Sequence, residues 1–345
     1  MLLFTQRSIF IEISFSMVTG ISVVIPNFNG VKLFPYTIHT VLEALENSGK
    51  PSEIIVVDDC STDDSVAYLQ QNFPQTKIIR GSSNKGFSQS ANTGIEAARY
   101  DKVLLLNSDV KLTPNYFIHQ YKYFDSPDTF GVMGRIIGWD DELIQDGAKY
   151  PSFHGVKIKT SGNYILRDTQ IMSNGLYSMY LSGANAFIDK EKFIAIGGFN
   201  KAFSPFYIED YELSLRAWRL GFKCYYDYKS VCQHKISTSI NKSNKKSFVD
   251  IIYNRNKMIL HALHLEGIRK LLWYIQLVLE SFIQLAMLRW RYLKSLRLFL
   301  SSSKEIKLAK RRFTICTKDC KNSKSVNEVA IFIMDDIKMR NIIKF

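Results

Sequence analysis

The segment ISVVIP (21–26) decides the fold class, because it is an unbroken apolar run rich in β-branched residues. Such a run is typical of a strand buried on both faces of a parallel sheet. Similar strands and helix-period stretches alternate after it, with strands at 53–59, 77–79 and 102–109 and helices at 33–46, after Ser61 and at 86–99. This alternation indicates right-handed βαβ crossovers. The sequence therefore predicts an α/β fold with a mostly parallel central sheet.

Polar residues stand where these predicted strands end. They are Asn27 and Asn29 after the first strand, Asp58 and Asp59 at the end of the second, and Asn107, Ser108 and Asp109 at the end of the fourth. Ligands of open α/β sheets bind beyond the carboxyl ends of the strands. The first strand is followed neither by the G-x-G-x-x-G fingerprint nor by a Walker lysine loop. We therefore expect phosphates to be bound in another way, with a metal ion held by Asp109.

The region that follows is less regular. Residues 112–180 contain turn-rich and strand-like pieces whose order the sequence pattern does not reveal. After them, YLSGANAFID (180–189) predicts a strand, and a short helix follows it. In FYIEDYELSLRAWRLG (206–221) the apolar residues recur at helical spacing, which places Glu209 and Asp210 at the start of a helix. A last strand, KCYYDY (223–228), leads toward His234.

The composition is that of an ordinary globular protein. Of 345 residues, 46% are hydrophobic and 22% are charged, which excludes a disordered chain. Five cysteines at unrelated spacings form neither a zinc pattern nor a disulfide framework, which fits a reducing cytoplasm. No repeat of about 20–50 residues is visible, so a solenoid is excluded as well.

The positive charge belongs to the C-terminal third. Residues 1–234 hold 22 Lys/Arg and 24 Asp/Glu, a net of −2, whereas residues 235–345 hold 23 and 8, a net of +15. Such a segment calls for an anionic neighbour, which is a membrane surface, a nucleic acid or a partner protein. A solvated basic tail is the simpler alternative. No base-reading module for a nucleic acid is evident.

An apolar helical segment lies within this basic region, from 268 to 300. Its only strongly polar residues over 271–288 are Gln276, Glu280 and Gln284, which share one helical stripe, and basic residues follow it. A central Glu in lipid would cost about 2–3 kcal/mol or more, which argues against a membrane span. A helix lying in the plane of a membrane is favoured, and packing on the catalytic domain is the alternative.

The first residues, 1–16, look at first like a signal peptide. Arg7 and Glu12 interrupt the apolar run, however, and a second methionine stands at Met17. We expect 1–16 to be an extraneous leader.

Seven motifs in order resemble the family 2 glycosyltransferases, most closely the rhamnosyltransferase-like branch. They are ISVVIPNFNG, EIIVVDDCSTDDS, NKGFSQSANTGIEAA, VLLLNSDV, LSGANAFID, GGFN and FYIEDYELSLRAWRLGFK, between about residues 20 and 240. The resemblance implies a GT-A fold and an inverting, metal-dependent transfer of a sugar from a nucleoside diphosphate to a hydroxyl group.

The resemblance also implies roles for the residues at the strand ends. Phe28 would lie against the nucleobase, with Pro26 and Asn29 shaping the turn, and Asp58 and Asp59 would hold the base and the ribose. On the residues alone, Phe28 also suits packing on the sheet, and the two aspartates also suit a helix cap.

Further donor contacts follow from the same resemblance. Lys85 would meet the diphosphate, although a solvated surface lysine is equally consistent with its spacing. The resemblance also places Gly183, in LSGANAFID, among the residues that bind the donor. Asn107, Ser108 and Asp109 occupy the place of the family's Asp-x-Asp motif, and Asn107 replaces its first carboxylate. Asp109 is then the one firm anionic ligand for Mg²⁺ or Mn²⁺.

Asp210 is the expected catalytic base, and the resemblance implies that His234 meets the metal or the diphosphate, so His234 is expected to be the second metal ligand after Asp109. An inverting transfer needs one carboxylate to take the acceptor's proton. The alternative for Glu209 and Asp210 is stabilisation of a helix N-terminus, worth about 0.3–1 kcal/mol. For His234 the alternative is an ordinary structural histidine.

We expect the protein to transfer a single sugar to a hydroxyl of a glycan or lipid-linked acceptor in cell-surface polysaccharide biosynthesis. Rhamnose is one candidate for that sugar. A catalytically silent sugar-nucleotide-binding or scaffold protein is the alternative, with Asn107 in its favour. We expect a GT-A catalytic domain at 17–240 (nucleotide-binding half 17–111, acceptor-binding half 112–240), a helical extension at 241–312 and a tail at 313–345. The expected location is the inner face of the plasma membrane.

Overall fold

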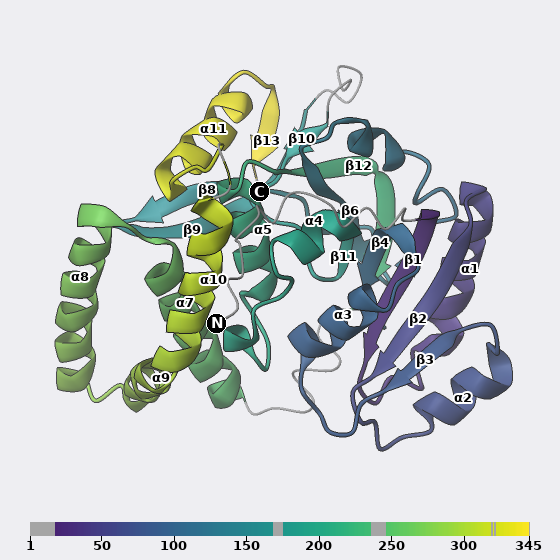
Figure 1. Cartoon of the computed structure of the whole chain (residues 1–345), viewed down its shortest axis with the longest axis horizontal. Helices are drawn as coiled ribbons and strands as arrows, with labels where there is room; N and C mark the ends of the chain where they lie inside the picture. Colours follow the sequence, from purple (N-terminus) through teal and green to yellow (C-terminus); the bar gives the residue numbers. More distant parts are fainter. Residues whose placement is uncertain (1–17, 168–174, 236–245, 319, 321, 345) are drawn as a thin grey trace, which may run out of the picture.

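The computed structural model describes residues 18–167, 175–235, 246–318, 320 and 322–344 (Figure 1). The predicted leader at 1–16 lies outside these residues.

A large mixed sheet forms the centre of the described part of the molecule. Its main path runs β10 (Leu176–Tyr177), β12 (Lys223–His234), β6 (Thr129–Gly138), β11 (Asn185–Asp189), β4 (Tyr100–Leu106), β1 (Val18–Asn27), β2 (Ser52–Asp58) and β3 (Lys77–Arg80). Beside this path, β5 (Val110–Leu112) pairs with β12, and β7 (Ile144–Asp146) pairs with β6.

Most strands on the main path run in one direction. β3, β2, β1 and β4 are paired in parallel, and so are β6 and β12. β11 lies between β4 and β6 and is antiparallel to both, so β4 and β6 point the same way. The prediction of an α/β fold with a mostly parallel central sheet is confirmed.

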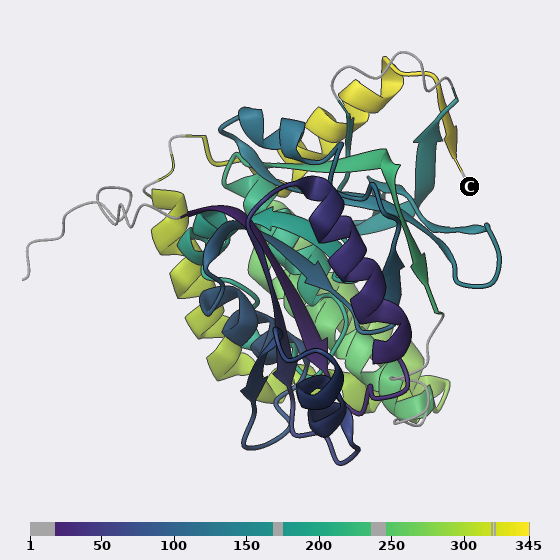
Figure 2. The ribbon, with the colours of Figure 1, turned by 90° about the vertical axis from the view of Figure 1, so that its right-hand side faces the viewer.

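Helices cover both faces of the sheet (Figures 1 and 2). Consecutive strand residues point to opposite faces, so Val23 packs in the cluster under α1 (Phe34–Ser48) and α2 (Ser65–Asn72), and Val24 in the cluster on the other face. That second cluster contains the buried faces of α3 (Phe87–Glu96), α4 (Lys190–Ala195) and α5 (Glu209–Arg219). Buried hydrophobic residues on each face therefore hold the strand ends in fixed positions.

Two predicted strands end differently from their patterns. The prediction of a strand over 180–189 is wrong in its first half, because only Asn185–Asp189 forms β11. The backbone N–H of Asn185 bonds Ser182 in a turn, which directs Gly183 away from the sheet and toward α5. The strand predicted at 102–109 ends at Leu106, and a turn closed from Val110 N–H to the Asn107 carbonyl follows.

The irregular region 112–180 contributes strands to two sheets. Besides β5, β6, β7 and β10 it contains the 3₁₀ helix η1 (Tyr121–Asp125) and the strands β8 (Ala148–His154) and β9 (Lys157–Leu166). A second, three-stranded sheet joins β8 and β9 to β13 (Ile342–Lys344) near the C-terminus. The pairing of β13 with β9 places the C-terminal residues 342–344 beside residues 164–166, near the middle of the sequence.

Helices follow the sheet domain, as predicted. After the 3₁₀ helix η3 (Lys201–Phe203) and α5, they are α7 (Lys246–His264), α8 (Gly267–Ala286), α9 (Trp290–Ser301), α10 (Ser303–Lys318) and α11 (Val326–Lys338). Buried residues of α7, α10 and α11 belong to the same hydrophobic cluster as α5. The domain boundary at 240 stays a prediction. Helices that follow it and the sheet that precedes it contribute to the same hydrophobic core.

The apolar segment 268–300 forms two helices, α8 and α9, separated by a turn in which Leu288 has φ +52°. Within the residues that the structure describes, no helix combines the length and the apolar character that crossing a membrane requires.

Candidate active site

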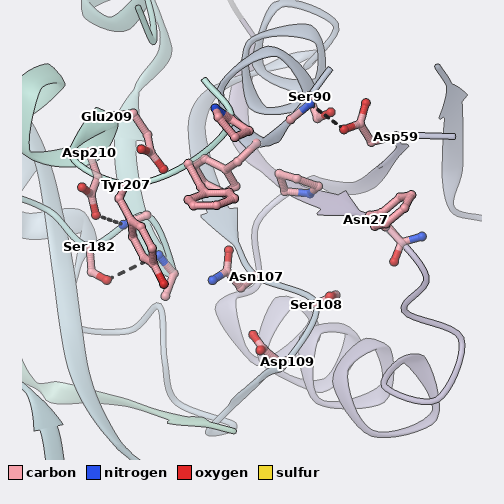
Figure 3. A pocket seen from close by; sticks show the side chains of 18 of the residues that line it. Asn27, Asp59, Ser90, Asn107, Ser108, Asp109, Ser182, Tyr207, Glu209 and Asp210 are labelled. Carbon is pink, nitrogen blue, oxygen red and sulfur yellow. Dashed lines mark hydrogen bonds between the residues drawn. The ribbon is translucent and has the colours of Figure 1, made fainter. Parts of the chain in front are cut away.

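A cavity of about 620 Å³ opens at the carboxyl ends of β1, β2 and β4, and the start of α5 forms its far wall (Figure 3). The predicted site residues among its lining are Pro26, Phe28, Asp59, Asn107, Ser108, Asp109, Gly183, Asp210 and His234. This volume falls in the range of sites that enclose a small organic ligand.

Three predicted donor-binding residues, Asn29, Asp58 and Lys85, are not part of this lining. The Asp58 carboxylate accepts hydrogen bonds from Asn27 Nδ2 at 2.9 Å and from the Ser61 backbone at 3.1 Å, so it holds the turn after β2. Asn29 Oδ1 accepts a bond from the Thr62 N–H at 2.8 Å. The side chain of Lys85 is exposed. Their contact with a donor stays a prediction.

Asp59 is buried and fixes the loop before α3. Its two carboxylate oxygens accept the backbone N–H groups of Lys85 at 2.9 Å and Gly86 at 2.7 Å. Gly86 has φ +83°, and a Cβ there would come within 2.9 Å of the Pro205 carbonyl oxygen. A side chain at this position would therefore push apart two walls of the cavity.

Asp109 and His234 meet at the edge of the cavity. The antiparallel pairing of β5 with β12 sets His234 opposite Val110, and the Lys235 N–H bonds the Asp109 carbonyl at 3.1 Å. His234 Nε2 consequently lies 3.5 Å from Asp109 Oδ1. Within the described residues, no group of three or more His, Cys, Asp or Glu is placed to hold a metal ion. These two side chains are thus the pair from which an ion site could be built.

Gln145 of β7 orients the ring of His234. Its Nε2 donates to the His234 carbonyl at 3.1 Å, which fixes the direction of the amide. Its Oε1 therefore faces His234 Nδ1, 3.0 Å away, and can only accept a hydrogen bond there. In a neutral ring the proton is then on Nδ1, and the lone pair of Nε2 faces Asp109. A partner of this kind is typical of metal-binding histidines.

Asp210 begins α5 as predicted, and it lies across the cavity from Asp109 (Figure 3). Its carboxylate accepts the N–H of Gly183 at 3.2 Å and the N–H of Tyr211 at 2.7 Å. Burial raises the pKa of Asp210, and the two backbone N–H groups oppose that rise. A carboxylate held in this way is fixed in position and is more basic than one in water.

Glu209 also lines the cavity, but it is held differently. It is 7% exposed, and its Oε2 has no hydrogen-bond partner among the described residues. Burial raises the pKa of Glu209 well above its usual value, and the neighbouring Asp210 carboxylate raises it further. When two close carboxyls titrate together, the better-solvated one carries the charge. We therefore infer that Glu209 is the neutral member of the pair and Asp210 the ionised one.

The loop before α5 has a strained backbone that α7 holds in place. Tyr207 and Ile208 have φ values of +72° and +73°, in the left-handed region that ordinary residues avoid. Asn256, fully buried on α7, donates to the carbonyl oxygens of Phe203, Phe206 and Tyr207 at 2.8–2.9 Å. The C-terminal extension thereby fixes the loop that positions Asp210.

Asn256→Leu is expected to lower the free energy of unfolding by about 1–3 kcal/mol, because it leaves buried carbonyl oxygens without their donor. Chemical denaturation measures this loss. Asn72→Leu is the matched control, since Asn72 Nδ2 also donates to a backbone carbonyl but at an exposed site. Equal losses in the two variants would contradict the role of Asn256.

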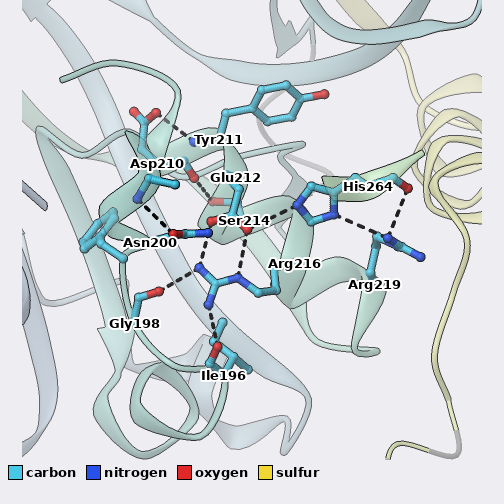
Figure 4. A network of polar contacts seen from close by, with 12 residues as sticks. Ile196, Gly198, Asn200, Asp210, Tyr211, Glu212, Ser214, Arg216, Arg219 and His264 are labelled. Atoms are coloured by element: carbon cyan, nitrogen blue, oxygen red, sulfur yellow. Dashed lines mark hydrogen bonds and ion pairs between the residues drawn. The ribbon is translucent and has the colours of Figure 1, made fainter. Parts of the chain in front are cut away.

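A buried ionic network holds the rest of α5 (Figure 4). Arg216 donates to the Glu212 carboxylate at 2.8 and 3.1 Å and to the Gly198 carbonyl at 2.7 Å. His264 of α7 lies 3.2 Å from the same carboxylate. Burial favours the neutral acid, but Arg216 and His264 lower the pKa of Glu212 to about 2. The charged network ties α5 to α7 and to the Gly-Gly turn after α4.

Several lining residues were missed from the sequence, among them Asn84, Phe87, Ser90, Ser182, Pro205, Phe206 and Tyr207. All of them lie within the quoted motifs or directly beside one, so membership of a motif was the available signal. Gln145 and Asn256 carried no such signal, because both act through contacts with segments far away in the sequence.

Comparison with known proteins gives a family and relatives. A family model described as Glycosyl transferase family 2 matches residues 22–197. An uncharacterized glycosyltransferase of Haemophilus influenzae is 25% identical over 197 residues, 57% of this chain and 61% of the relative. A chondroitin synthase of Escherichia coli is 26% identical over 258 residues, 72% of this chain and 33% of the relative. An undecaprenyl-phosphate 4-deoxy-4-formamido-L-arabinose transferase of Pectobacterium carotovorum is 35% identical over 123 residues, 34% of this chain and 37% of the relative. The chain thus spans less than two thirds of the length of these relatives.

Two solved structures share the fold at low sequence identity. The crystal structure of GalNAc-T7 with UDP, GalNAc and Mn²⁺ has a TM-score of 0.64 and 15% identity, over 94% of this chain and 58% of that one. The mannosyltransferase PcManGT from Pyrobaculum calidifontis, in complex with GDP-Man and Mn²⁺, has a TM-score of 0.50 and 13% identity, over 88% and 86%. The expected GT-A fold is confirmed. The matched family model ends before Asp210 and His234.

Proposed function

The chain belongs to glycosyl transferase family 2, and on this basis we propose that it is an inverting glycosyltransferase that moves a single sugar from a nucleoside diphosphate to an acceptor hydroxyl. One observation carries the proposal. A single cavity is lined by Asp109 and His234, which lie 3.5 Å apart, and by the half-buried Asp210 across from Asp109. A metal-assisted leaving group and a base for the acceptor are the two requirements of such a transfer.

The donor would lie over the strand ends. Phe28 is 38% exposed at the mouth of the cavity, so its ring is available to stack on a nucleobase. Asp59 lies deeper in the same wall, where a carboxylate suits the ribose hydroxyls. Gly183 lets the chain pass close to Phe87 and Asp210 at the cavity wall, because a Cβ there would meet Phe87 at 3.2 Å and Asp210 at 3.7 Å.

Asp109 and His234 fit a divalent ion. Two ligand atoms that each lie about 2.0–2.2 Å from one ion are separated by roughly 3–3.5 Å, and Asp109 Oδ1 and His234 Nε2 are 3.5 Å apart. These two ligands include only one carboxylate, because Asn107 stands where a second would be expected. One or two protein ligands are enough for Mg²⁺ or Mn²⁺ when phosphate oxygens complete the coordination shell. Bound there, the ion would neutralise the departing diphosphate.

Asp210 would act on the acceptor. Its oxygens are fixed by Gly183 and Tyr211, and its raised pKa brings its basicity closer to neutral pH. It would take the proton of the acceptor hydroxyl as that oxygen attacks the sugar carbon from the face opposite the diphosphate. The bond to the diphosphate breaks in the same displacement, so the configuration of the sugar is inverted.

The finer identity of the substrates is also proposed. The motif resemblance favours rhamnose as the sugar and a glycan or lipid-linked hydroxyl as the acceptor, in cell-surface polysaccharide biosynthesis. The similarity to a transferase named for undecaprenyl phosphate supports a lipid-linked acceptor. Peripheral attachment to the inner face of the plasma membrane would bring the site to such an acceptor, and the basic C-terminal third suits an anionic surface.

A screen of nucleotide sugars tests the proposal. Uridine, thymidine and guanosine diphosphate sugars are added with and without Mn²⁺ or Mg²⁺, and the midpoint of thermal unfolding is measured. At least one donor should raise the midpoint, and more so with metal. That donor should then be turned over with a hydroxyl acceptor. Metal-dependent binding without turnover by any acceptor would favour the catalytically silent alternative, and no binding would contradict both.

Gln145→Leu is expected to lower the affinity for Mn²⁺ about 10–100-fold, because the ring of His234 loses the partner that orients it. Titration of Mn²⁺ in the presence of UDP, followed by electron paramagnetic resonance, measures the change. Gln145→Glu keeps an acceptor facing His234 Nδ1 and should retain most of the affinity. Unchanged Mn²⁺ binding in Gln145→Leu would contradict the proposed orientation.

A further inference from the structure

Helix α8 faces the protein with the side that carries its polar stripe together with two buried apolar side chains. Glu280 Oε2 lies 2.6 Å from Lys157 Nζ, and Gln276 donates to Glu280 Oε1 at 2.9 Å. The only buried side chains of α8 are Trp273, 0% exposed, and Leu277, 6% exposed. Figure 1 shows the helix at the edge of the molecule, away from the central sheet.

The opposite side of α8 is apolar and open. Its most prominent residues share one helical face and are each at least 49% exposed; we call Ile268, Leu271, Ile275, Val278, Leu279 and Phe282 the outer face. A helix on a water-soluble protein ordinarily buries its apolar face and exposes its polar one. Here the larger apolar face is exposed and the polar stripe faces the protein. An apolar surface of this extent marks a contact with another apolar phase or molecule.

We propose that the outer face of α8 inserts into a membrane surface rich in anionic lipids, with the helix lying in the plane of that surface. This inference rests on the peripheral attachment proposed above and names the element responsible, and it does not depend on the transfer chemistry. The apolar outer face would occupy the boundary between headgroups and acyl chains.

Charge favours a membrane over a second copy of the chain. Residues 267–318 hold 12 Lys/Arg and 2 Asp/Glu, a net of +10. Arg289 and Arg291 are exposed just after α8, on either side of Trp290, which is 61% exposed. Trp and Arg together suit the interfacial region of an anionic bilayer. Two copies of this chain would bring the same positive charges together, which opposes association.

The contacts on the inner side of α8 explain why it would lie in the plane and not cross. Lys270 Nζ donates to the Ala262 carbonyl at 2.7 Å near one end, and Lys157 pairs with Glu280 farther along. Insertion across a bilayer would break these bonds and leave Glu280 in hydrocarbon. Lying flat keeps them, and a helix of 20 residues, about 30 Å long, presents its whole outer face to lipid.

Phe282→Glu tests the proposal by sedimentation with vesicles. The unchanged protein should pellet with phosphatidylcholine vesicles that contain phosphatidylglycerol, less at high salt and less with pure phosphatidylcholine. Phe282→Glu should lower the bound partition at least about tenfold. Met339→Glu is the matched control, because Met339 is 83% exposed, lies outside α8 and receives the same added charge. It should bind nearly as well as the unchanged protein.

Ile275→Glu repeats the test at a second position of the outer face, and the thermal midpoint of each variant shows that it is folded. Donor binding and turnover of a soluble acceptor should be unchanged in all three variants, so a failure of the proposed function would be detected separately. No pelleting of the unchanged protein, or equal pelleting of Phe282→Glu and Met339→Glu, would overturn the proposal. A dimer in light scattering that Phe282→Glu converts to a monomer would also overturn it, in favour of a second copy.

Discussion

Asp210→Asn is expected to lower turnover by about 10²–10⁴-fold, because it removes the proton acceptor while keeping the size of the side chain. Asparagine also retains an oxygen that can accept the N–H of Gly183 or Tyr211. Donor affinity and the thermal midpoint should therefore stay near those of the unchanged protein. All three quantities are measured on the one variant.

Glu209→Gln is the matched control for Asp210→Asn. If Glu209 is the neutral member of the pair, as its burial and its raised pKa indicate, glutamine is nearly isosteric with it and turnover should change less than about tenfold. The helix-stabilising alternative predicts near-normal turnover for Asp210→Asn as well. Turnover of Asp210→Asn within about threefold of the unchanged protein would mean that the base lies elsewhere, and Glu209 is the next candidate.

The pH dependence of turnover gives an independent check on Asp210. A general base acts in its deprotonated form, so kcat/KM should rise with pH through the pKa of Asp210 and level off above it. Burial raises that pKa, and the acidic limb should therefore lie above the ordinary range of an aspartate. Asp210→Asn should lose this limb. An identical limb in the variant would assign the titration to another group.

Asp109→Ala is expected to abolish Mn²⁺ binding in the presence of UDP and to lower turnover at least about 10²-fold, because metal stabilisation of a leaving group is worth several kcal/mol. Donor affinity should weaken as well, and the thermal midpoint without ligand reports whether the fold is kept. Titration of Mn²⁺ and steady-state rates with and without metal measure these effects.

Two neighbouring substitutions sharpen this test. Ser108→Ala lies in the same turn and removes no charge, so it should bind Mn²⁺ much as the unchanged protein does. Asn107→Asp supplies the carboxylate that the chain lacks and should raise Mn²⁺ affinity. Full metal-stimulated turnover in Asp109→Ala would remove the metal assignment from this turn.

Local sequence patterns were enough to predict the strands and helices from Ile21 to Asp109 and most of the site residues at the strand ends. Apolar runs of strand length and helix-period stretches alternate from Ile21 to Asp109, and each pattern is set by which side chains a local segment must bury. Strand ends follow from the same patterns, so Asp59 and Asp109 were placed at one edge of the sheet. The start of α5 could also be predicted from neighbouring residues alone, because the helical spacing of apolar residues follows directly after Glu209 and Asp210.

Contacts between distant segments needed the tertiary structure. His234 faces Asp109 only because β12 pairs with β5 in one register, and Gln145, 89 residues earlier than His234, completes the arrangement from β7. Asn256 stands in the polar run NRNK (254–257), where nothing distinguishes it from its neighbours, and its role appears only when it contacts the loop at Phe203–Tyr207. Such pairings depend on how the whole chain packs, which no local periodicity encodes.

Helix α8 shows the same division most clearly. The sequence established an apolar helix with one polar stripe, because side chains three and four residues apart share a face. Which face turns inward depended on contacts of the folded chain: Trp273 and Leu277 are buried, and Glu280 forms an ion pair with Lys157 of β9. The apolar stripe was known from the sequence, and its exposure was decided by contacts on the other side of the helix that only the folded chain makes.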